Sequence, residues 1–371
     1  MPTSRTNAAC CFAAVIAGAG CGAELPDLVD VPDVVSESRG AGGAGRLLSM
    51  QVFVDATDFA EADRYEARLR SLFDAAQDRG LLDARTIVVL PEYVGTWLVV
   101  EGEGATVALK PTVGDAMTEM ALWTPSFLFN KLGSPVIDGD AYALFTDKSA
   151  SMAATYQRVM SGLANDYDVM LVAGSIILPT PSLVDGVISV TPGDLLQNVS
   201  VVFDADGDAI AVSRKHFPTA DEVGFVDAED DVAVVDTPIG RLGVLVCADA
   251  WFPESYARLQ EQGAELLAVP TFHSGGDAAW TAPWGGYSGQ AFPDDVDPAD
   301  VGVLTEATAW DTYALAGRAA DAGIRAAVSA PLRGTLWDLG ATGQAFLVDD
   351  QGFQRTSADN TPGLFSLELA P

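Results

Sequence analysis

Apolar runs that suit buried strands alternate along this chain with segments of helical periodicity. Residues 47–55 and 86–90 are rich in Leu, Ile and Val, and apolar runs of this length are typical of strands buried in a sheet. Residues 60–80 predict an amphipathic helix, because apolar side chains recur there every three or four positions. These side chains are Tyr65, Leu69, Leu72 and Phe73. The alternation continues along the chain and predicts an α/β fold.

A carboxylate, an ammonium group and a thiol each stand at the end of a predicted strand. Glu92 follows the run at 86–90, and Lys215 follows a later strand. Cys247 ends the apolar run at 243–246 and is followed by a turn and a predicted helix. Strand ends of a layered α/β fold collect at one rim, where active sites form. The pattern therefore predicts that the three side chains share one site.

These residue types suit nucleophilic attack on a carbonyl carbon. A thiolate is the reactive form of Cys247, and the nearby Lys215 ammonium favours that form. Glu92 can act as the base if burial raises its pKa towards neutrality. Lys215 and the backbone N–H of Ala248 are the natural donors to the oxyanion that forms. Water would then hydrolyse the resulting thioester, with Glu92 again as the base.

The three motifs and their order resemble those of the nitrilase superfamily, the carbon–nitrogen hydrolases. The motifs are Pro91-Glu92, Arg214-Lys215 and Cys-x-Asp-x-x-Phe-Pro-Glu at 247–254. The resemblance extends over roughly residues 47–369, with similar segments at 310–331 and 340–352. It implies a four-layer αββα sandwich of the nitrilase type. It also implies a catalytic set of Glu92, Lys215 and Cys247.

The resemblance extends to a second carboxylate. Glu222 lies seven residues after Lys215, and the family often has a glutamate at about that distance that positions substrate or the hydrolytic water. Asp249 is expected to orient the turn after Cys247 rather than to react. Trp251 suits either the core or a pocket wall.

Two long segments exceed what a minimal hydrolase core needs. Long loops in compact domains commonly serve as lids or pocket walls. Residues 99–150 form either such a wall or a helical hairpin packed on the domain, and the sequence leaves both open. Residues 271–309 are rich in Gly, Pro and Trp, which favours a loop that encloses substrate. Its best candidates for contact are Trp280, Trp284 and Tyr287.

The first 20 residues have the features of a bacterial signal peptide. Arg5 precedes the apolar stretch Ala8–Gly20, which is too short to span a bilayer. The sequence Gly-Ala-Gly before Cys21 resembles a lipobox, although the usual Leu is absent. We therefore expect lipidation of Cys21, a flexible acidic tether over 21–46 and a hydrolase domain over 47–371. An ordinary secretory signal is the alternative.

Composition excludes several kinds of partner and site. The formal net charge is −32, with 52 acidic and 20 basic residues, which disfavours binding to nucleic acid or to an anionic membrane surface. The two histidines, His216 and His273, form no zinc-binding spacing, so no metal site is expected. His216 is expected to face away from the site. No nucleotide-binding glycine motif is present, and no cofactor is expected.

Three readings of the function remain. The first is an amidase-type hydrolase of a small amide. A true nitrilase would be a special case of this hypothesis, and the sequence Cys-Ala-Asp at 247–249 disfavours it. The second is an N-acyltransferase that passes the acyl group to an amine. The third is a non-catalytic binding module. The expected partners are a small amide or nitrile and a membrane lipid at the cell envelope, and a homodimer stays open.

Overall fold

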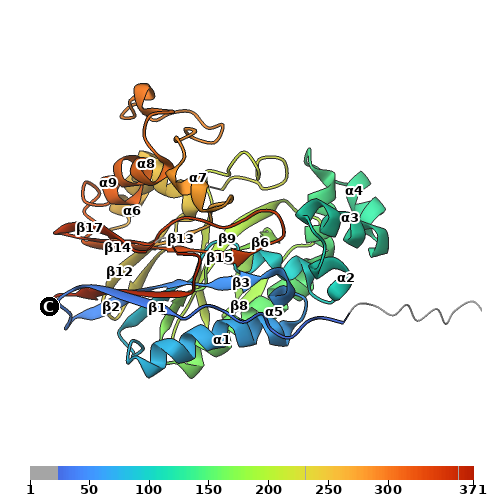
Figure 1. Ribbon diagram of the computed structural model, residues 1–371, viewed down its shortest axis with the longest axis horizontal. Coiled ribbons are helices and arrows are strands. Elements are labelled where there is room, and N and C mark those ends of the chain that lie inside the picture. The colour runs from blue at the N-terminus through green and yellow to red at the C-terminus, as the bar shows by residue number, and fades with distance from the viewer. Residues whose placement is uncertain (1–23, 230, 358) are drawn as a thin grey trace, which may run out of the picture.

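In the computed structural model, two β-sheets stack face to face and helices cover both outer faces (Figure 1). The structure describes residues 24–229, 231–357 and 359–371. The layer order is αββα, which confirms the predicted four-layer sandwich. The predicted signal peptide and Cys21 lie outside the described residues.

The first sheet mixes parallel and antiparallel pairs. Its order is β1 (Val35–Gly40), β18 (Gly363–Leu369), β2 (Gly45–Gln51), β4 (Thr86–Val89), β5 (Met170–Val172), β9 (Leu196–Phe203) and β10 (Ala209–Arg214), with β6 (Ile176–Pro179) also paired to β9. The second sheet runs in the order β11 (Val234–Thr237), β12 (Gly240–Val244), β13 (Leu266–Thr271), β14 (Ala326–Pro331), β16 (Phe346–Asp349) and β17 (Gly352–Arg355). Two short pairs lie outside these sheets: β3 (Phe53–Asp55) with β15 (Arg333–Thr335), and β7 (Ser182–Val184) with β8 (Val187–Ser189).

Helices pack on the outer face of each sheet. The first sheet is covered by α1 (Ala62–Asp78) and α5 (Gly139–Asp166), and the second by α6 (Pro253–Glu261), α8 (Glu306–Tyr313) and α9 (Leu315–Arg318). The other described helices are η1 (Ala56–Phe59), η2 (Thr96–Val100), α2 (Ala105–Ala108), α3 (Val113–Trp123), α4 (Phe127–Leu132), η3 (Cys247–Trp251), α7 (Asp277–Thr281) and η4 (Pro298–Asp300). The predicted helix at 60–80 corresponds to α1 and buries all four of its predicted apolar side chains.

Strand β4 shows how an apolar run fills two cores at once. Ile87 and Val89 point between the sheets, while Val88 and Leu90 point into the core beneath α1 and α5. Side chains alternate across a strand, so a strand covered on both faces needs apolar residues at every position. Full burial of each such side chain contributes about 1.5–3 kcal/mol.

The segment before the predicted domain differs from the expected flexible tether. Residues 35–40 form β1, which pairs in parallel with β18 at the edge of the first sheet. Arg39 of β1 forms an ion pair with Asp349 of β16 (2.6 Å) and so links the two sheets. The alternation of half-buried and exposed residues along Val-Ser-Glu-Ser-Arg-Gly suits an edge strand that faces solvent on one side.

The helix pair α3–α4 exposes an unusual amount of apolar surface. Helix α4 buries none of its residues. Six large apolar side chains of α3, α4 and the following turn are 64–95% exposed: Leu122, Trp123, Leu128, Phe129, Leu132 and Ile137. Exposed apolar clusters of this kind commonly mark contact surfaces. Within the described ranges, no helix has the length and apolar character that crossing a membrane requires.

Gly174 holds the loop after β4 against the strand end of β5, and its replacement should destabilise the protein. Its φ is +70°, and an added Cβ would lie 2.1 Å from the carbonyl oxygen of Pro91. Gly80 has nearly the same φ, +68°, but faces open space. We expect Gly80→Ala to cost about 1–2 kcal/mol through backbone strain alone, and Gly174→Ala to cost a further 1–3 kcal/mol, roughly, through the clash. Urea denaturation of both variants measures the difference, and equal losses would contradict this account.

Candidate active site

The ends of three strands from two sheets meet beneath one cavity. Glu92 follows β4 and Lys215 follows β10 in the first sheet, while Cys247 follows β12 in the second. The Nζ atom of Lys215 lies 2.8 Å from Oε1 of Glu92 and 2.6 Å from Oε2 of Glu222. None of the four residues is more than 5% exposed. The structure thus brings together the expected catalytic set and the second carboxylate, Glu222.

Cys247 sits on a tight turn between strand and helix. Its φ is +46°, a left-handed conformation that few residues other than glycine adopt without strain. Asp249 fixes this turn, because its carboxylate accepts the backbone N–H groups of Val246 (3.2 Å), His216 (3.0 Å) and Phe217 (2.9 Å). Asp249 therefore ties the thiol-bearing turn to the strand end that carries Lys215, consistent with the expected orienting role.

The Glu92 carboxylate accepts hydrogen bonds at both of its oxygens. Asn198 Nδ2 donates to its Oε1 (3.0 Å), and the N–H of Phe272 donates to its Oε2 (3.1 Å). The Cys247 thiol donates to the carbonyl of Phe272 (3.7 Å), the same residue whose N–H donates to Glu92, and the Glu92 charge acts on the pKa of the thiol. Burial raises the pKa of Glu92 above its usual 4.5, and the Lys215 charge opposes this only in part. A carboxylate whose pKa is raised is a stronger proton acceptor.

Glu222 differs from Glu92 in its surroundings and in its pKa. It accepts hydrogen bonds from Tyr93 Oη (2.5 Å), Asn198 Nδ2 (2.8 Å) and the N–H of Thr219 (2.8 Å). Burial favours the neutral acid, but the Lys215 ammonium and the hydrogen bonds outweigh it and lower the pKa of Glu222. Glu222 is therefore the carboxylate that stays ionised beside Lys215.

The same charges keep Lys215 protonated and the thiol neutral. Burial lowers the pKa of Lys215, but Glu222 and Glu92 outweigh it, so the net pKa is raised. Burial and the Glu92 charge raise the pKa of Cys247 well above its usual value. The Lys215 charge lowers the pKa of Cys247, as expected, but burial and the Glu92 charge have the larger effect. The resting site thus holds a thiol next to a carboxylate that can receive its proton.

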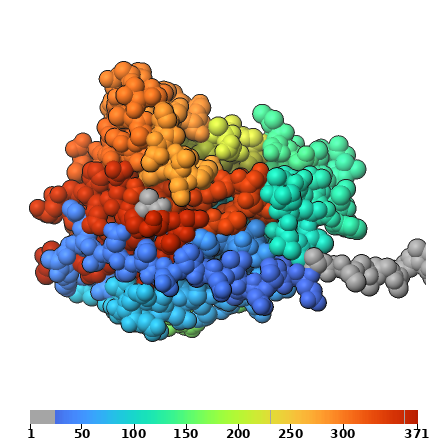
Figure 2. Space-filling view, viewed as in Figure 1, coloured from blue at the N-terminus to red at the C-terminus, as the bar shows by residue number. Residues whose placement is uncertain are grey.

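The cavity above these residues has a volume of about 580 Å³. Its walls come from the two long segments as well as from the core: Val113 and Met117 of α3 on one side, and Tyr287 and Gln290 on the other. Figure 2 shows these segments gathered along one side of the molecule, with the loop after β10 between them. Both segments are therefore pocket walls, and the first is also helical.

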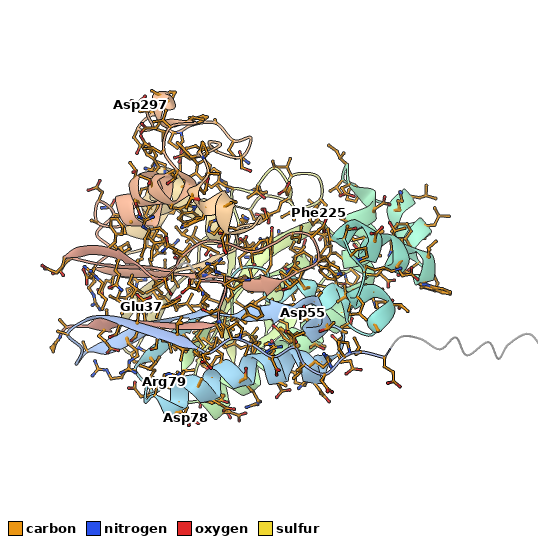
Figure 3. The ribbon with its side chains drawn as sticks, viewed as in Figure 1. Glu37, Asp55, Asp78, Arg79, Phe225 and Asp297 are labelled. Carbon is orange, nitrogen blue, oxygen red and sulfur yellow. The ribbon has the colours of Figure 1, made fainter. Side chains whose placement is uncertain are left out.

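The aromatic residues of the site divide between wall and core. Four of these aromatics belong to the buried cluster beneath the outer helices of the second sheet. Tyr287 and Trp251 also line the cavity, whereas Trp280 and Trp284 do not. The expectation that all three aromatics of 271–309 contact substrate is thus met in the geometry only by Tyr287. Phe225, labelled in Figure 3, packs its ring on Phe145 of α5 at 5.9 Å between centroids, and both line the cavity.

Ala248 and the two histidines are the other residues near the site that the sequence singles out. Ala248 lines the cavity at the start of η3, where the first N–H groups of a helix have no acceptor within it. His273 lines the cavity, and burial lowers its pKa to about 3, so it is neutral. The His216 ring packs edge-on against Phe217 at 4.4 Å. Among the described residues, no group of His, Cys, Asp and Glu is arranged to hold a metal ion.

Sequence reasoning missed two side chains that organise the site, Tyr93 and Asn198. Asn198 is an amide within the fully buried strand β9, and a buried amide in an apolar run needs partners. A polar amide within this apolar run is the feature of the sequence that could have indicated Asn198. Tyr93 directly follows Glu92 but has a φ of +62°, which no sequence pattern indicated.

The site thus consists of a buried thiol, an ammonium group and two carboxylates at the strand ends of an αββα sandwich. The chain belongs to the carbon-nitrogen hydrolase family, whose sequence pattern matches residues 85–352.

The curated relatives match only part of the chain. A deaminated glutathione amidase of Dictyostelium discoideum is 33% identical over 101 residues, which are 24% of this chain and 35% of that protein. The same enzyme of Yersinia enterocolitica is 31% identical over 136 residues, 33% of this chain and 44% of that protein. An N-carbamoylputrescine amidase of Arabidopsis thaliana is 34% identical over 79 residues, 20% and 26% of the two chains. The matched part thus spans less than half the length of these relatives.

Solved structures agree over more of the chain. An amidase from Nesterenkonia sp. AN1, with the acetamide moiety of fluoroacetamide on its active-site cysteine, has a TM-score of 0.55 and 18% identity. The match covers 89% of this chain and 92% of that one. At this identity the likeness concerns the fold.

Replacement of Asn198 should weaken the site without unfolding the protein. Asn198→Ala removes a donor from both carboxylates, and loss of a hydrogen bond to a charged group costs about 1.5–3 kcal/mol. We expect the hydrolysis rate of an amide to fall roughly tenfold to a hundredfold. Because Glu92 loses a donor to its ionised form, its pKa should rise further, so the acid limb of the pH–rate profile should move to higher pH.

Ser200→Ala is the matched control for this variant. Ser200 lies two residues along the same strand, is fully buried, and its hydroxyl has no hydrogen-bond partner. Its replacement should change neither the rate nor the acid limb. An acid limb that stays in place in Asn198→Ala would exclude a positioning role for this amide.

Proposed function

We propose that the protein is an amidase-type hydrolase of non-peptide carbon–nitrogen bonds that works through a thioester with Cys247. The observation that carries this proposal is the buried contact of Lys215 with Glu92 and Glu222, beside the Cys247 thiol at the base of the cavity. Family membership and the names of the relatives support it. The cavity volume of about 580 Å³ suits a small molecule rather than a folded protein.

Acylation begins with transfer of the thiol proton to Glu92. As the proton leaves, Sγ of Cys247 bonds to the carbonyl carbon, and the oxygen gains the negative charge. The Lys215 ammonium and the N–H of Ala248 stabilise that oxyanion. Glu92 then gives its proton to the departing amine, the carbon–nitrogen bond breaks, and the thioester remains.

Deacylation uses the same groups, with water in place of the thiol as the nucleophile. Glu92 takes a proton from water, the hydroxide oxygen bonds to the thioester carbon, and the same donors hold the second oxyanion. The carbon–sulfur bond then breaks and the proton on Glu92 returns to sulfur. Glu222 keeps Lys215 charged and in place throughout, since it is ionised and paired with it.

Glu92→Gln should trap the intermediate, because glutamine cannot take the proton of water. We expect intact-mass spectra under a small primary amide to show an acyl adduct on any enzyme that still acylates, and steady-state turnover to fall by at least roughly a thousandfold. The control is Cys247→Ala, which should show neither adduct nor turnover. Normal turnover in Glu92→Gln would rule out its role as base, and turnover in Cys247→Ala would rule out the thioester.

We also propose that the chain is attached to the bacterial cell envelope through lipid on Cys21. Three observations support this location. Arg64 and Arg68 of α1 donate to the carbonyls of Pro26 (2.9 Å) and Val29 (2.8 Å), so the first described residues run along α1. In Figure 1 they reach the edge of the molecule on the side where α2, α3 and α4 lie, and α3 and α4 expose large apolar side chains. The sequence before Cys21 resembles a lipobox.

Expression of the full chain in a bacterium that processes lipoproteins tests this attachment. We expect the protein to enter the detergent phase, with a mature N-terminus at Cys21 that carries a diacylglyceryl group, because two acyl chains give stable attachment where one is marginal. Cys21→Ala should abolish that partition, while Cys11→Ala, a second cysteine of the same segment, should preserve it. An unmodified N-terminus would show that the chain is simply secreted.

A further inference from the structure

Acidic residues outnumber basic residues around the cavity. Five of the described lining residues are acidic: Glu92, Asp138, Asp221, Glu222 and Glu306. Lys215 is the one lysine or arginine among the described lining residues, and it is already paired with two carboxylates. Recognition of a substrate carboxylate depends on an arginine or lysine that is free to pair with it. This cavity therefore disfavours anionic substrates.

Glu306 is the acidic wall residue that the catalytic steps do not use. It lies in the first turn of α8 and lines the cavity half-buried. Burial raises its pKa to about 7 against an opposing effect of Trp310, and within the described part of the chain no lysine or arginine acts on it. A desolvated carboxylate without a cation is costly. A positively charged ligand beside it would remove that cost.

The walls next to Glu306 are aromatic. Trp310 lies one helical turn after Glu306 and also lines the cavity. Its ring lies 5.1 Å from that of Trp251, which in turn lies 5.6 Å from that of Tyr287. All three rings line the cavity. Aromatic faces attract cations, and a carboxylate combined with aromatic walls is a common arrangement for an ammonium group.

We infer that the cavity selects amides that carry an ammonium group remote from the reacting carbonyl, with Glu306 as the group that pairs with it. Cys247 and Trp251 both lie on η3, and the Trp251 ring contacts that of Trp310, which shares α8 with Glu306. An aromatic wall therefore connects the thiol-bearing turn to Glu306. An acyl chain lying along this wall would place its reacting carbonyl at Cys247 and its charged end at Glu306. The inference rests on the proposed amidase function and adds the substrate class.

Three amides of similar length test the inference on the full-length protein. The first is ε-aminocaproamide, which carries an ammonium group, the second is its neutral isostere heptanamide, and the third is the anionic monoamide of adipic acid. We expect kcat/KM to be highest for the cationic amide, by roughly tenfold over the neutral one, and lowest for the anionic one. A wild-type enzyme that prefers the neutral or the anionic amide would overturn the inference.

Glu306→Gln identifies the residue responsible. The ratio of kcat/KM between the cationic and the neutral amide should fall roughly tenfold in this variant, because glutamine keeps the shape and loses the charge. Glu261→Gln is the control, since it removes a charge from an exposed position at the end of α6. It should leave the ratio unchanged. An unchanged ratio in Glu306→Gln would exclude this residue as the specificity determinant.

A binding measurement separates this inference from the proposed function. Cys247→Ala cannot form a thioester, but its cavity keeps Glu306, so calorimetry with the same three amides reads charge selection without turnover. Preferential binding of the cationic amide, lost on adding Glu306→Gln, supports the inference even if none of the amides is hydrolysed by the wild type. Equal binding of the cationic and neutral amides would overturn it whatever the turnover.

Discussion

The structure of the site depends on one buried ammonium group held between two carboxylates. Three charges removed from water are expensive, and their mutual attraction compensates only when the remaining lone pairs and protons are also satisfied. Here Asn198 donates to both carboxylates, and backbone N–H groups of Phe272 and Thr219 complete their shells. These donors explain why Lys215 can be only 1% exposed and still charged.

Because its members come from both sheets, this cluster is sensitive to how the sheets are stacked. Glu92 and Lys215 belong to the first sheet, and Cys247 to the second. Two buried hydroxyls fix the stacking: Ser49 donates to the carbonyl of Ser329 and Ser213 to that of Val244, each at 2.7 Å across the interface between the sheets. The apolar side chains between the sheets supply most of the stabilisation, but they have no preferred direction. Directional hydrogen bonds such as these set the alignment that the thiol and the carboxylate require.

The part of the site that the sequence predicted is the part that local rules determine. Glu92, Lys215 and Cys247 each follow a strand, and strand ends are visible as apolar runs. Asn198 and Tyr93 act through contacts with residues distant in the sequence, which no local pattern encodes. Trp280 and Trp284 were predicted to contact substrate but pack in the core. The sequence of a long loop does not show whether an aromatic side chain lines the cavity or packs behind its wall.

Strand β1 was missed for a related reason. Only one side of this edge strand is half-buried, and apart from Val35 its residues are polar or glycine, so its sequence resembles a linker. Its pairing with β18 joins residues 35–40 to 363–368, and a contact between segments at opposite ends of the chain leaves no periodic signal. The α/β class was predictable from buried strands and amphipathic helices, whose periodicity is visible in the sequence, whereas the four-layer arrangement was implied by the resemblance to the carbon–nitrogen hydrolases.

Charge links the surface of the molecule to its cavity. A formal net charge of −32 creates a negative potential around the protein, which raises the local concentration of cations and repels anions. The cavity carries the same sign, so the field outside and the wall inside favour the same ligands. Salt screens the outer field within roughly 10 Å at 0.1 M, whereas a half-buried carboxylate such as Glu306 is screened much less. Selection inside the cavity would therefore persist in salt concentrations that abolish steering at the surface.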